Sequence, residues 1–269
     1  MSDEQTSIDD RRDPWAQFRT VTQARIGLER SGDGLPTAAL LDFQLAHAHA
    51  RDTVHGVVDF ERLASEIEPT LPALQVHSAA RDRATYLRRP DLGRRLNPAS
   101  AALLDAERAE EAYDVVFVIG DGLSSAAVNE HALPTLFASL ALLADWKTAP
   151  VVLAGQARVA LGDEICRRLN ARLCVILIGE RPGLSVADSL GVYLTWSPQI
   201  GQKDSGRNCI SNIHPHGLTY AQAAHKLVWL MSEAHRLGLT GVGLKENADG
   251  SGTLQAARPL SLAGGADGG

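Results

Sequence analysis

The sequence predicts an α/β protein in which a Rossmann-like doubly wound parallel sheet follows an N-terminal helical region. Continuous apolar, β-branched runs are typical of parallel strands buried on both faces; they are residues 113–120 (YDVVFVIG), 149–155 (APVVLAG), 172–180 (RLCVILIGE) and 191–196 (GVYLTW). Segments with helical periodicity separate the first three runs. Strands that alternate with helices form parallel sheets through right-handed crossovers, with helices on both faces.

Apolar periodicity and terminal residues place the helices of this region. Residues 124–144 are helical in pattern but are interrupted at Pro134, where we expect a second helix to begin. Residues 157–169 have the same periodicity. The clearest helix covers residues 219–237 and is expected to stop at Gly238.

The part of the chain before residue 112 is expected to be mainly helical, apart from an acidic tail and a structured loop at residues 22–37, which is rich in glycine. Thr37 can cap a helix with a wide apolar stripe, and short amphipathic helices broken by prolines continue over residues 58–112. The predicted organisation is a disordered tail (1–12), a helical region that contacts a partner (13–111), a Rossmann-like domain (112–260) and a second disordered tail (261–269).

Composition and charge exclude several classes of protein. Of the 269 residues, 45% are hydrophobic and 22% charged, as in soluble globular chains. No uncharged apolar run approaches the roughly 20 residues of a membrane span, and the acidic first residues do not resemble a secretory signal. We therefore expect a cytoplasmic protein without membrane contact. The net charge of -6 argues against a nucleic-acid binder, and the three cysteines lack the spacing of a disulfide framework or a zinc cluster.

Residues 81–95 carry six arginines and two aspartates, a local excess of positive charge in an acidic protein. Arginine in place of lysine throughout favours planar, bidentate pairing with carboxylates or phosphates. We interpret this arginine-rich segment as a surface for a partner subunit. A solvated face and a nucleic-acid contact are the alternatives.

In open parallel sheets the ligand site lies outside the carboxyl ends of the strands. Three loops are expected there, at residues 120–125, 155–159 and 179–183. The first lacks the third glycine of the dinucleotide fingerprint, because Ser125 occupies that position. In the third, Glu180 follows an apolar strand directly, so its carboxylate needs a partner, either Arg181 or a ligand.

The long stretch from residue 197 to 217 is expected to be an irregular ligand-binding loop, since such loops are rarely filler in a compact domain. Cys209 within it is either a buried thiol or a nucleophile, with His214 or His216 as base. The N-x-H-x-x-G pattern at residues 212–217 is close to a cobalt-ligating motif, but its aspartate is replaced by asparagine, so we discount His214 as a ligand. No catalytic constellation or metal site is predicted for this chain.

Seven segments together resemble the small (light) subunit of ethanolamine ammonia-lyase, in family order from about residue 24 to 245. They are ARIGLERSGDGLPT, LDFQLAHAHARD, YLRRPDLGRRL, VFVIGDGLSSAAV, VALGDEI, LIGERPGLSVADSLGVYLT and RNCISNI. The departures from the family pattern are Gly120, Ala157 and Cys166.

The resemblance implies an adenosylcobalamin-dependent enzyme that converts ethanolamine to acetaldehyde and ammonia by a radical mechanism. It implies that a separate large subunit binds ethanolamine, and that the small subunit covers the corrinoid at the interface of a hetero-oligomer. Carried over by motif, the cofactor-binding residues are Val159, Glu180 and Cys209. In this family dimethylbenzimidazole ligates the cobalt, which agrees with discounting His214.

Two other functions stay open at this point. A stand-alone nicotinamide-dependent oxidoreductase would need an acidic ribose partner about 20 residues past the glycine loop, and Asp145 lies near that spacing. A non-catalytic scaffold subunit would use the arginine-rich segment only to bind a partner. Subunit stoichiometry and packaging in a bacterial microcompartment are also left open.

Overall fold

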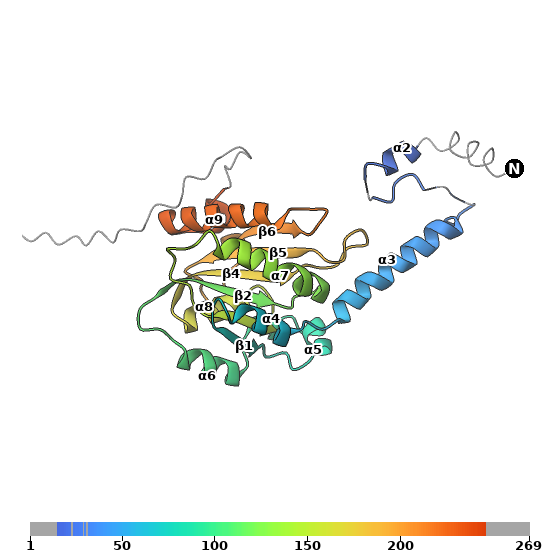
Figure 1. The fold of residues 1–269 in the computed structure, drawn as a ribbon. Helices are drawn as coiled ribbons and strands as arrows, with labels where there is room; N and C mark the ends of the chain where they lie inside the picture. Colours follow the sequence, from blue (N-terminus) through green and yellow to red (C-terminus); the bar gives the residue numbers. More distant parts are fainter. Residues whose placement is uncertain (1–14, 23, 29, 31, 246–269) are drawn as a thin grey trace, which may run out of the picture.

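The structure is a computed structural model that describes residues 15–22, 24–28, 30 and 32–245. The predicted tails at residues 1–12 and 261–269 lie outside the described residues, as do residues 246–260. A six-stranded sheet with helices on both faces forms the body of the described chain, and a helix projects from it (Figure 1). The α/β class is therefore confirmed.

The sheet is mixed and not parallel throughout. The strands are β1 (Ala73–His77), β2 (Tyr113–Gly120), β3 (Val151–Gly155), β4 (Ala171–Gly179), β5 (Leu190–Trp196) and β6 (Asn208–Ile213). Their order is β1-β3-β2-β4-β5-β6; the first four in this order are parallel, whereas β5 is antiparallel to β4 and β6 is antiparallel to β5. The prediction of a parallel, doubly wound sheet is wrong for the fourth predicted strand, β5, and the sheet as a whole is mixed.

The length of the connections explains the change of direction. A parallel return needs a crossover of about a dozen residues or more, usually with a helix. Residues 180–189 join β4 to β5 without a helix, and residues 197–207 join β5 to β6 with a single 3₁₀ turn. Both connections therefore return the chain antiparallel.

Two strands lie where the sequence predicted none. β1 lies in the region expected to be mainly helical, and β6 lies within the stretch expected to be irregular. Both occupy the edges of the sheet, and both are short and partly exposed. Edge strands of this kind lack the continuous apolar run by which β2, β3 and β4 are found.

The helices of the described chain are α2 (Ala16–Arg19), α3 (Thr37–His55), α4 (Phe60–Ile67), α5 (Arg83–Arg88), α6 (Pro98–Ala106), α7 (Ser125–Leu140), α8 (Leu161–Arg168) and α9 (Tyr220–Leu237), with 3₁₀ turns at Leu92–Arg94, Asp204–Gly206 and Gly241–Gly243. α9 confirms the predicted helix, with a capping box at Thr219 and Gln222 and with Gly238 left-handed after its last turn. The expectation of a new helix at Pro134 is wrong, because α7 continues through this residue.

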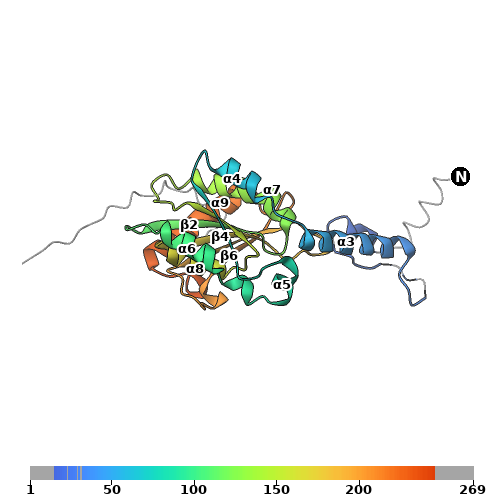
Figure 2. The ribbon, with the colours of Figure 1, turned by 90° about the horizontal axis from the view of Figure 1, so that it is seen from below.

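Helices cover both faces of the parallel strands (Figure 2). Neighbouring residues of β2 pack in opposite core layers. Phe117 and Ile119 pack in the core layer with α4, α7 and α9. Val116 and Val118 pack in the layer with α6 and α8. This double burial explains why β2 is apolar at consecutive positions.

Helix α3 extends away from the body of the molecule, and none of its residues is buried (Figure 1). Its exposed apolar side chains are Leu40, Leu41, Phe43 and Leu45. No helix among the described residues is both long enough and apolar enough to span a membrane.

Candidate functional site

The loops that follow β2, β3 and β4 meet at the carboxyl edge of the sheet and border an open cleft of about 430 Å³. The lining residues are Tyr86, Gly122, Leu123, Arg158, Val159, Ile178, Gly179, Glu180, Arg181 and Tyr193. The loops approach closely at Gly122, where φ is +56° and an added Cβ would lie 2.3 Å from the carbonyl oxygen of Gly179. Two of the three predicted cofactor-binding residues, Val159 and Glu180, therefore line one cleft.

The Glu180 carboxylate is held by the β5–β6 side of the cleft. Its Oε2 accepts hydrogen bonds from the hydroxyl of Ser189 and from the backbone N–H of Asn212. Its other oxygen, Oε1, lies beside Gly191, where an added Cβ would approach within 3.0 Å. Among the described residues Glu180 forms no ion pair with Arg181, so Oε1 is the carboxylate oxygen left for a ligand.

Cys209, the third predicted residue, lies on β6 directly opposite Tyr193 of β5. Tyr193 lines the cleft, so Cys209 reaches the site through this tyrosine. The Cys209 side chain is exposed, so the alternative of a buried thiol is wrong. Desolvation by the surrounding residues raises the pKa of its thiol, a hydrogen bond with Tyr193 lowers it, and the negative charge of Glu180 raises it. The thiol is therefore neutral at physiological pH, which makes it a poor nucleophile.

His214 is not placed to serve Cys209 as a base. His214 is buried, and its Nε2 lies 2.9 Å from Oδ1 of Asn212. Its Nδ1 accepts the backbone N–H of His216 at 3.3 Å. Both ring nitrogens of His214 are thus engaged within its own turn, which argues against His214 as a base for Cys209 and as a cobalt ligand.

Sequence reasoning missed a tyrosine at the floor of the site. Tyr86 is fully buried and donates a hydrogen bond from its hydroxyl to the carbonyl oxygen of Ala157 at 2.9 Å. The guanidinium carbons of Arg158 and Arg83 lie 4.3 Å and 4.9 Å from the centre of its ring. The backbone N–H of Arg158 donates to the carbonyl oxygen of Gly93. The segment YLRRPDLGRRL thus positions the loop that carries Arg158 and Val159.

Three buried polar side-chain atoms near this edge have no hydrogen-bond partner among the described residues: Nη2 of Arg83, Oε1 of Gln156 and Nε of Arg158. Asp121 forms an ion pair with Arg83 at 3.5 Å. Its carboxylate also accepts hydrogen bonds from the backbone N–H groups of Gln156 and Ala157. Unpartnered buried donors and acceptors are costly in a folded chain. Arg83 and Gln156 line a separate cavity on the β1 side, and only Arg158 of the three lines the cleft.

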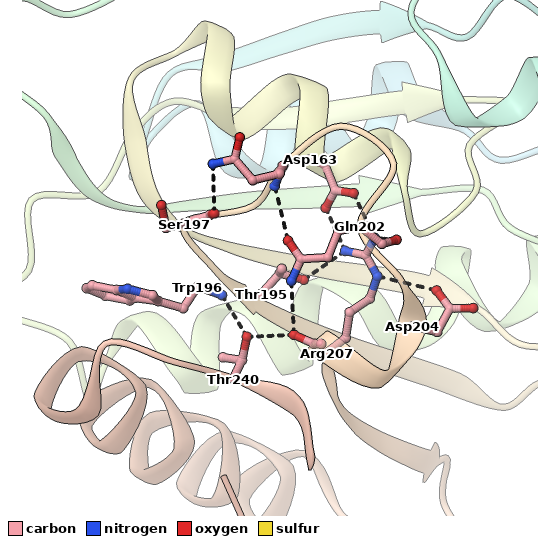
Figure 3. A network of polar contacts seen from close by, with 10 residues as sticks. Asp163, Thr195, Trp196, Ser197, Gln202, Asp204, Arg207 and Thr240 are labelled. Carbon is pink, nitrogen blue, oxygen red and sulfur yellow. Dashed lines mark hydrogen bonds and ion pairs between the residues drawn. The ribbon is translucent and has the colours of Figure 1, made fainter. Parts of the chain in front are cut away.

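A buried ion pair ties two segments of the site together (Figure 3). The Arg207 guanidinium, next to β6, donates to both carboxylate oxygens of Asp163 on α8, at 2.6 and 2.7 Å. It also donates to Oγ1 of Thr195 and to the carbonyl oxygen of Gln202. Both charged side chains are only 1% exposed. The pair fixes the strand of Cys209 against the helix that follows Val159. No sequence pattern indicates it beyond the presence of an arginine two residues before Cys209.

The structure disfavours the nicotinamide-binding alternative. Helix α7 begins at the carboxyl edge after β2 and returns to the amino edge before β3. Asp145 lies in that return, so it is at the opposite edge of the sheet from the glycine loop at residues 120–125. The two parts of a dinucleotide site therefore do not come together.

Comparison with known proteins agrees with the sequence resemblance. Residues 12–245 match the family model described as ethanolamine ammonia-lyase light chain (EutC). The chain is 54% identical over 243 residues to a protein named ethanolamine ammonia-lyase small subunit from Azotobacter vinelandii, with 88% of this chain and 89% of that protein covered. Proteins of the same name from Pseudomonas putida (52% over 241 residues, 88% and 89% covered) and Xanthomonas campestris pv. campestris (49% over 260 residues, 93% and 96% covered) are similar to it as well. The chain therefore belongs to the ethanolamine ammonia-lyase light-chain family, whose members are subunits of a carbon–nitrogen lyase.

Proposed function

We propose that this chain is the small subunit of an adenosylcobalamin-dependent ethanolamine ammonia-lyase, and that it binds the corrinoid at its interface with a large subunit. The enzyme would convert ethanolamine to acetaldehyde and ammonia, with ethanolamine bound by the large subunit. The observation that carries the proposal is the convergence of Val159, Glu180 and, through Tyr193, Cys209 on one cleft. These are the positions at which the family motifs place the cofactor.

The residues at the cleft fit the chemistry of this cofactor. A corrin ring is a broad, largely apolar disc edged with carboxamides, and the cofactor carries a phosphate and ribose groups. Val159 offers apolar surface, Oε1 of Glu180 can accept an amide or ribose donor, and the Arg158 guanidinium at the cleft can donate to a carbonyl or phosphate oxygen. The cleft is open and small for such a group, which favours a ligand that a second subunit covers.

Bound adenosylcobalamin would supply radical chemistry through homolysis of its cobalt–carbon bond. The residues of this chain would bind and orient it: Glu180 by hydrogen bonding and Val159 by apolar contact, while the neutral Cys209 packs beside Tyr193. None of these side chains is assigned a proton-transfer step. Catalytic groups would then belong to the large subunit.

The purified chain alone is expected to release no acetaldehyde from ethanolamine, with or without adenosylcobalamin, because its described residues form no acid–base or radical-stabilising constellation at the cleft. An alcohol dehydrogenase-coupled assay measures this directly. Turnover by the small subunit without a partner would contradict the assignment of the catalytic groups to the large subunit.

The large subunit is proposed to contact α3 and the arginine-rich segment. Leu41 and Leu45 lie one turn apart on α3 and are 58% and 57% exposed. Burying a leucine side chain contributes about 1.5–3 kcal/mol. The variant Leu41→Ser/Leu45→Ser is therefore expected to weaken association with the large subunit by roughly tenfold or more while its circular dichroism spectrum stays unchanged. Val242→Ser, at an exposed apolar position on the body, is the control; equal affinities of both variants by surface plasmon resonance would exclude α3 from the interface.

The exposed arginines Arg88, Arg89, Arg94 and Arg95 give a separate test. Replacing all four with alanine is expected to weaken co-purification with the large subunit by roughly tenfold or more, since arginines are frequent anchors of interfaces. Folding should change little, because exposed charges contribute little to stability. Arg236→Ala, an exposed arginine on α9, is the control. Unfolding of the quadruple variant together with normal co-purification would assign the segment a structural role.

Two ligand titrations separate the proposal from the alternatives. An adenosylcobalamin titration of the complex should change its absorption spectrum, whereas a nicotinamide-fluorescence titration should show no binding. A scaffold subunit would assemble without any effect on corrinoid affinity.

We also propose a cytoplasmic location. Cell fractionation tests it and distinguishes free enzyme from enzyme packaged in a microcompartment.

A further inference from the structure

A fully buried histidine with an unsatisfied ring nitrogen lies outside the cofactor cleft. His131 is on α7 and is 0% exposed. Its Nδ1 lies 3.0 Å from the hydroxyl of Tyr220, at the start of α9. Its Nε2 is buried and has no hydrogen-bond partner among the described residues. The imidazole is thus oriented by one nitrogen while the other is left without a partner.

The unpaired Nε2 points toward carboxylates from two elements. Oδ2 of Asp188, in the loop between β4 and β5, lies 3.7 Å from it. Glu130, the neighbouring residue on α7, completes a group whose ligand atoms all lie within 4.8 Å of one another. The distance of 3.7 Å exceeds that of a hydrogen bond. It is close to the ~3.4 Å that separates two ligand atoms of a tetrahedral ion bound at ~2.1 Å from each.

We propose that Glu130, His131 and Asp188 form a binding site for a divalent transition-metal ion of the zinc class. One imidazole and two carboxylates are a ligand set that Zn²⁺ and Co²⁺ accept. The ion would bind Nε2, and Nδ1–H would donate to the Tyr220 hydroxyl, the kind of outer hydrogen bond that orients metal-ligating histidines.

The site is accessible to an ion from solvent. The Asp188 side chain is 40% exposed and borders a separate cleft of about 390 Å³ between α3, residues 183–188 and the turn at residues 214–216. Glu130 is exposed, so its carboxylate can rotate to close the remaining distance. The buried imidazole would supply the fixed ligand, and the two carboxylates would complete the site from outside.

The position of the ion implies a structural role. Asp188 precedes Ser189, whose hydroxyl and carbonyl oxygen both bond Glu180. An ion that ties Asp188 to α7 would therefore restrain the loop at residues 181–189 next to the proposed cofactor carboxylate. This role is independent of the cofactor, and the binding of the ion can be measured without it.

Co²⁺ binding to the full-length chain, stripped of metal with a chelator, tests the proposal. We expect one equivalent of Co²⁺ per chain with visible d–d bands, displaced by Zn²⁺. Asp188→Asn, at a partly exposed position, should weaken Co²⁺ binding by roughly tenfold or more without unfolding, and His131→Gln should do the same. Zn²⁺ should slow amide hydrogen exchange in residues 181–189 of the wild type and not of Asp188→Asn.

Because the chain has nine histidines, adventitious binding needs a matched control. His49→Gln removes an exposed imidazole that lines the neighbouring cleft and should leave Co²⁺ affinity unchanged. Two results would overturn the proposal: no stoichiometric Co²⁺ binding, or equal affinity in the wild type and Asp188→Asn. In either case the contact between His131 and Asp188 holds the loop without a metal.

Discussion

Replacement of Arg207 with methionine is expected to lower the free energy of unfolding by about 3–5 kcal/mol, the cost of leaving a buried carboxylate without its partner. Asp163 and Arg207 are each 1% exposed and are joined by two hydrogen bonds of 2.6 and 2.7 Å. Asp163→Asn should have a similar effect, because it leaves the guanidinium buried and uncompensated. Urea denaturation followed by circular dichroism measures both.

The double variant Asp163→Leu/Arg207→Met is expected to recover at least half of the loss, since replacing both charges removes the unpaired ion. Arg236→Met is the matched control: Arg236 also pairs with a carboxylate, Glu233, at 2.6 Å, but its side chain is 64% exposed, so little change is expected. If Arg207→Met is no more destabilising than Arg236→Met, the buried pair does not hold β6 against α8.

Glu180→Gln is expected to leave the complex assembled and to raise the dissociation constant for adenosylcobalamin by roughly 10- to 150-fold. A hydrogen bond to a charged acceptor contributes about 1.5–3 kcal/mol, which gives that range of affinity. Ser189 and Asn212 bind Oε2, so the glutamine side chain can keep an oxygen at that position. The substitution removes the negative charge of the carboxylate and with it the acceptor Oε1. Glu180→Ala should weaken binding at least as much. Absorbance titrations with native gels measure affinity and assembly together.

Glu111→Gln is the control for Glu180. Glu111 precedes β2 at the amino edge of the sheet and is exposed, with Lys147 as its partner. It should not affect cofactor affinity. Equal dissociation constants for wild type and Glu180→Gln in an intact complex would make Glu180 a carboxylate that only holds the Ser189 loop.

The strands that carry the site could be predicted because they are buried on both faces. β2, β3 and β4 have continuous apolar runs, and their carboxyl ends place Val159 and Glu180 at one edge. β1 and β6 could not be found in this way, because each lies at an edge of the sheet and is partly exposed, so neither has a continuous apolar run. The antiparallel direction of β5 was missed although the short connection before it indicates the direction.

The parts of the site that sequence reasoning missed depend on long-range contacts. Tyr86 meets Ala157 across 71 positions, and Arg207 meets Asp163 across 44. No local pattern reports such pairs, because each residue alone is typical of a solvated helix or loop. Only Gly93, between two pairs of arginines, marks the contact of Tyr86 with the loop of Ala157 in the local sequence. A side chain does not fit there, because an added Cβ would lie 2.9 Å from both Arg158 and Tyr86.

The most direct test of the central claim is co-expression of this chain with an ethanolamine ammonia-lyase large subunit, followed by an acetaldehyde assay of the purified complex. Acetaldehyde and ammonia should appear in equal amounts only when both chains, ethanolamine and adenosylcobalamin are present. Full activity of the large subunit with adenosylcobalamin but without this chain would contradict the account, as would an assembled complex that binds no adenosylcobalamin.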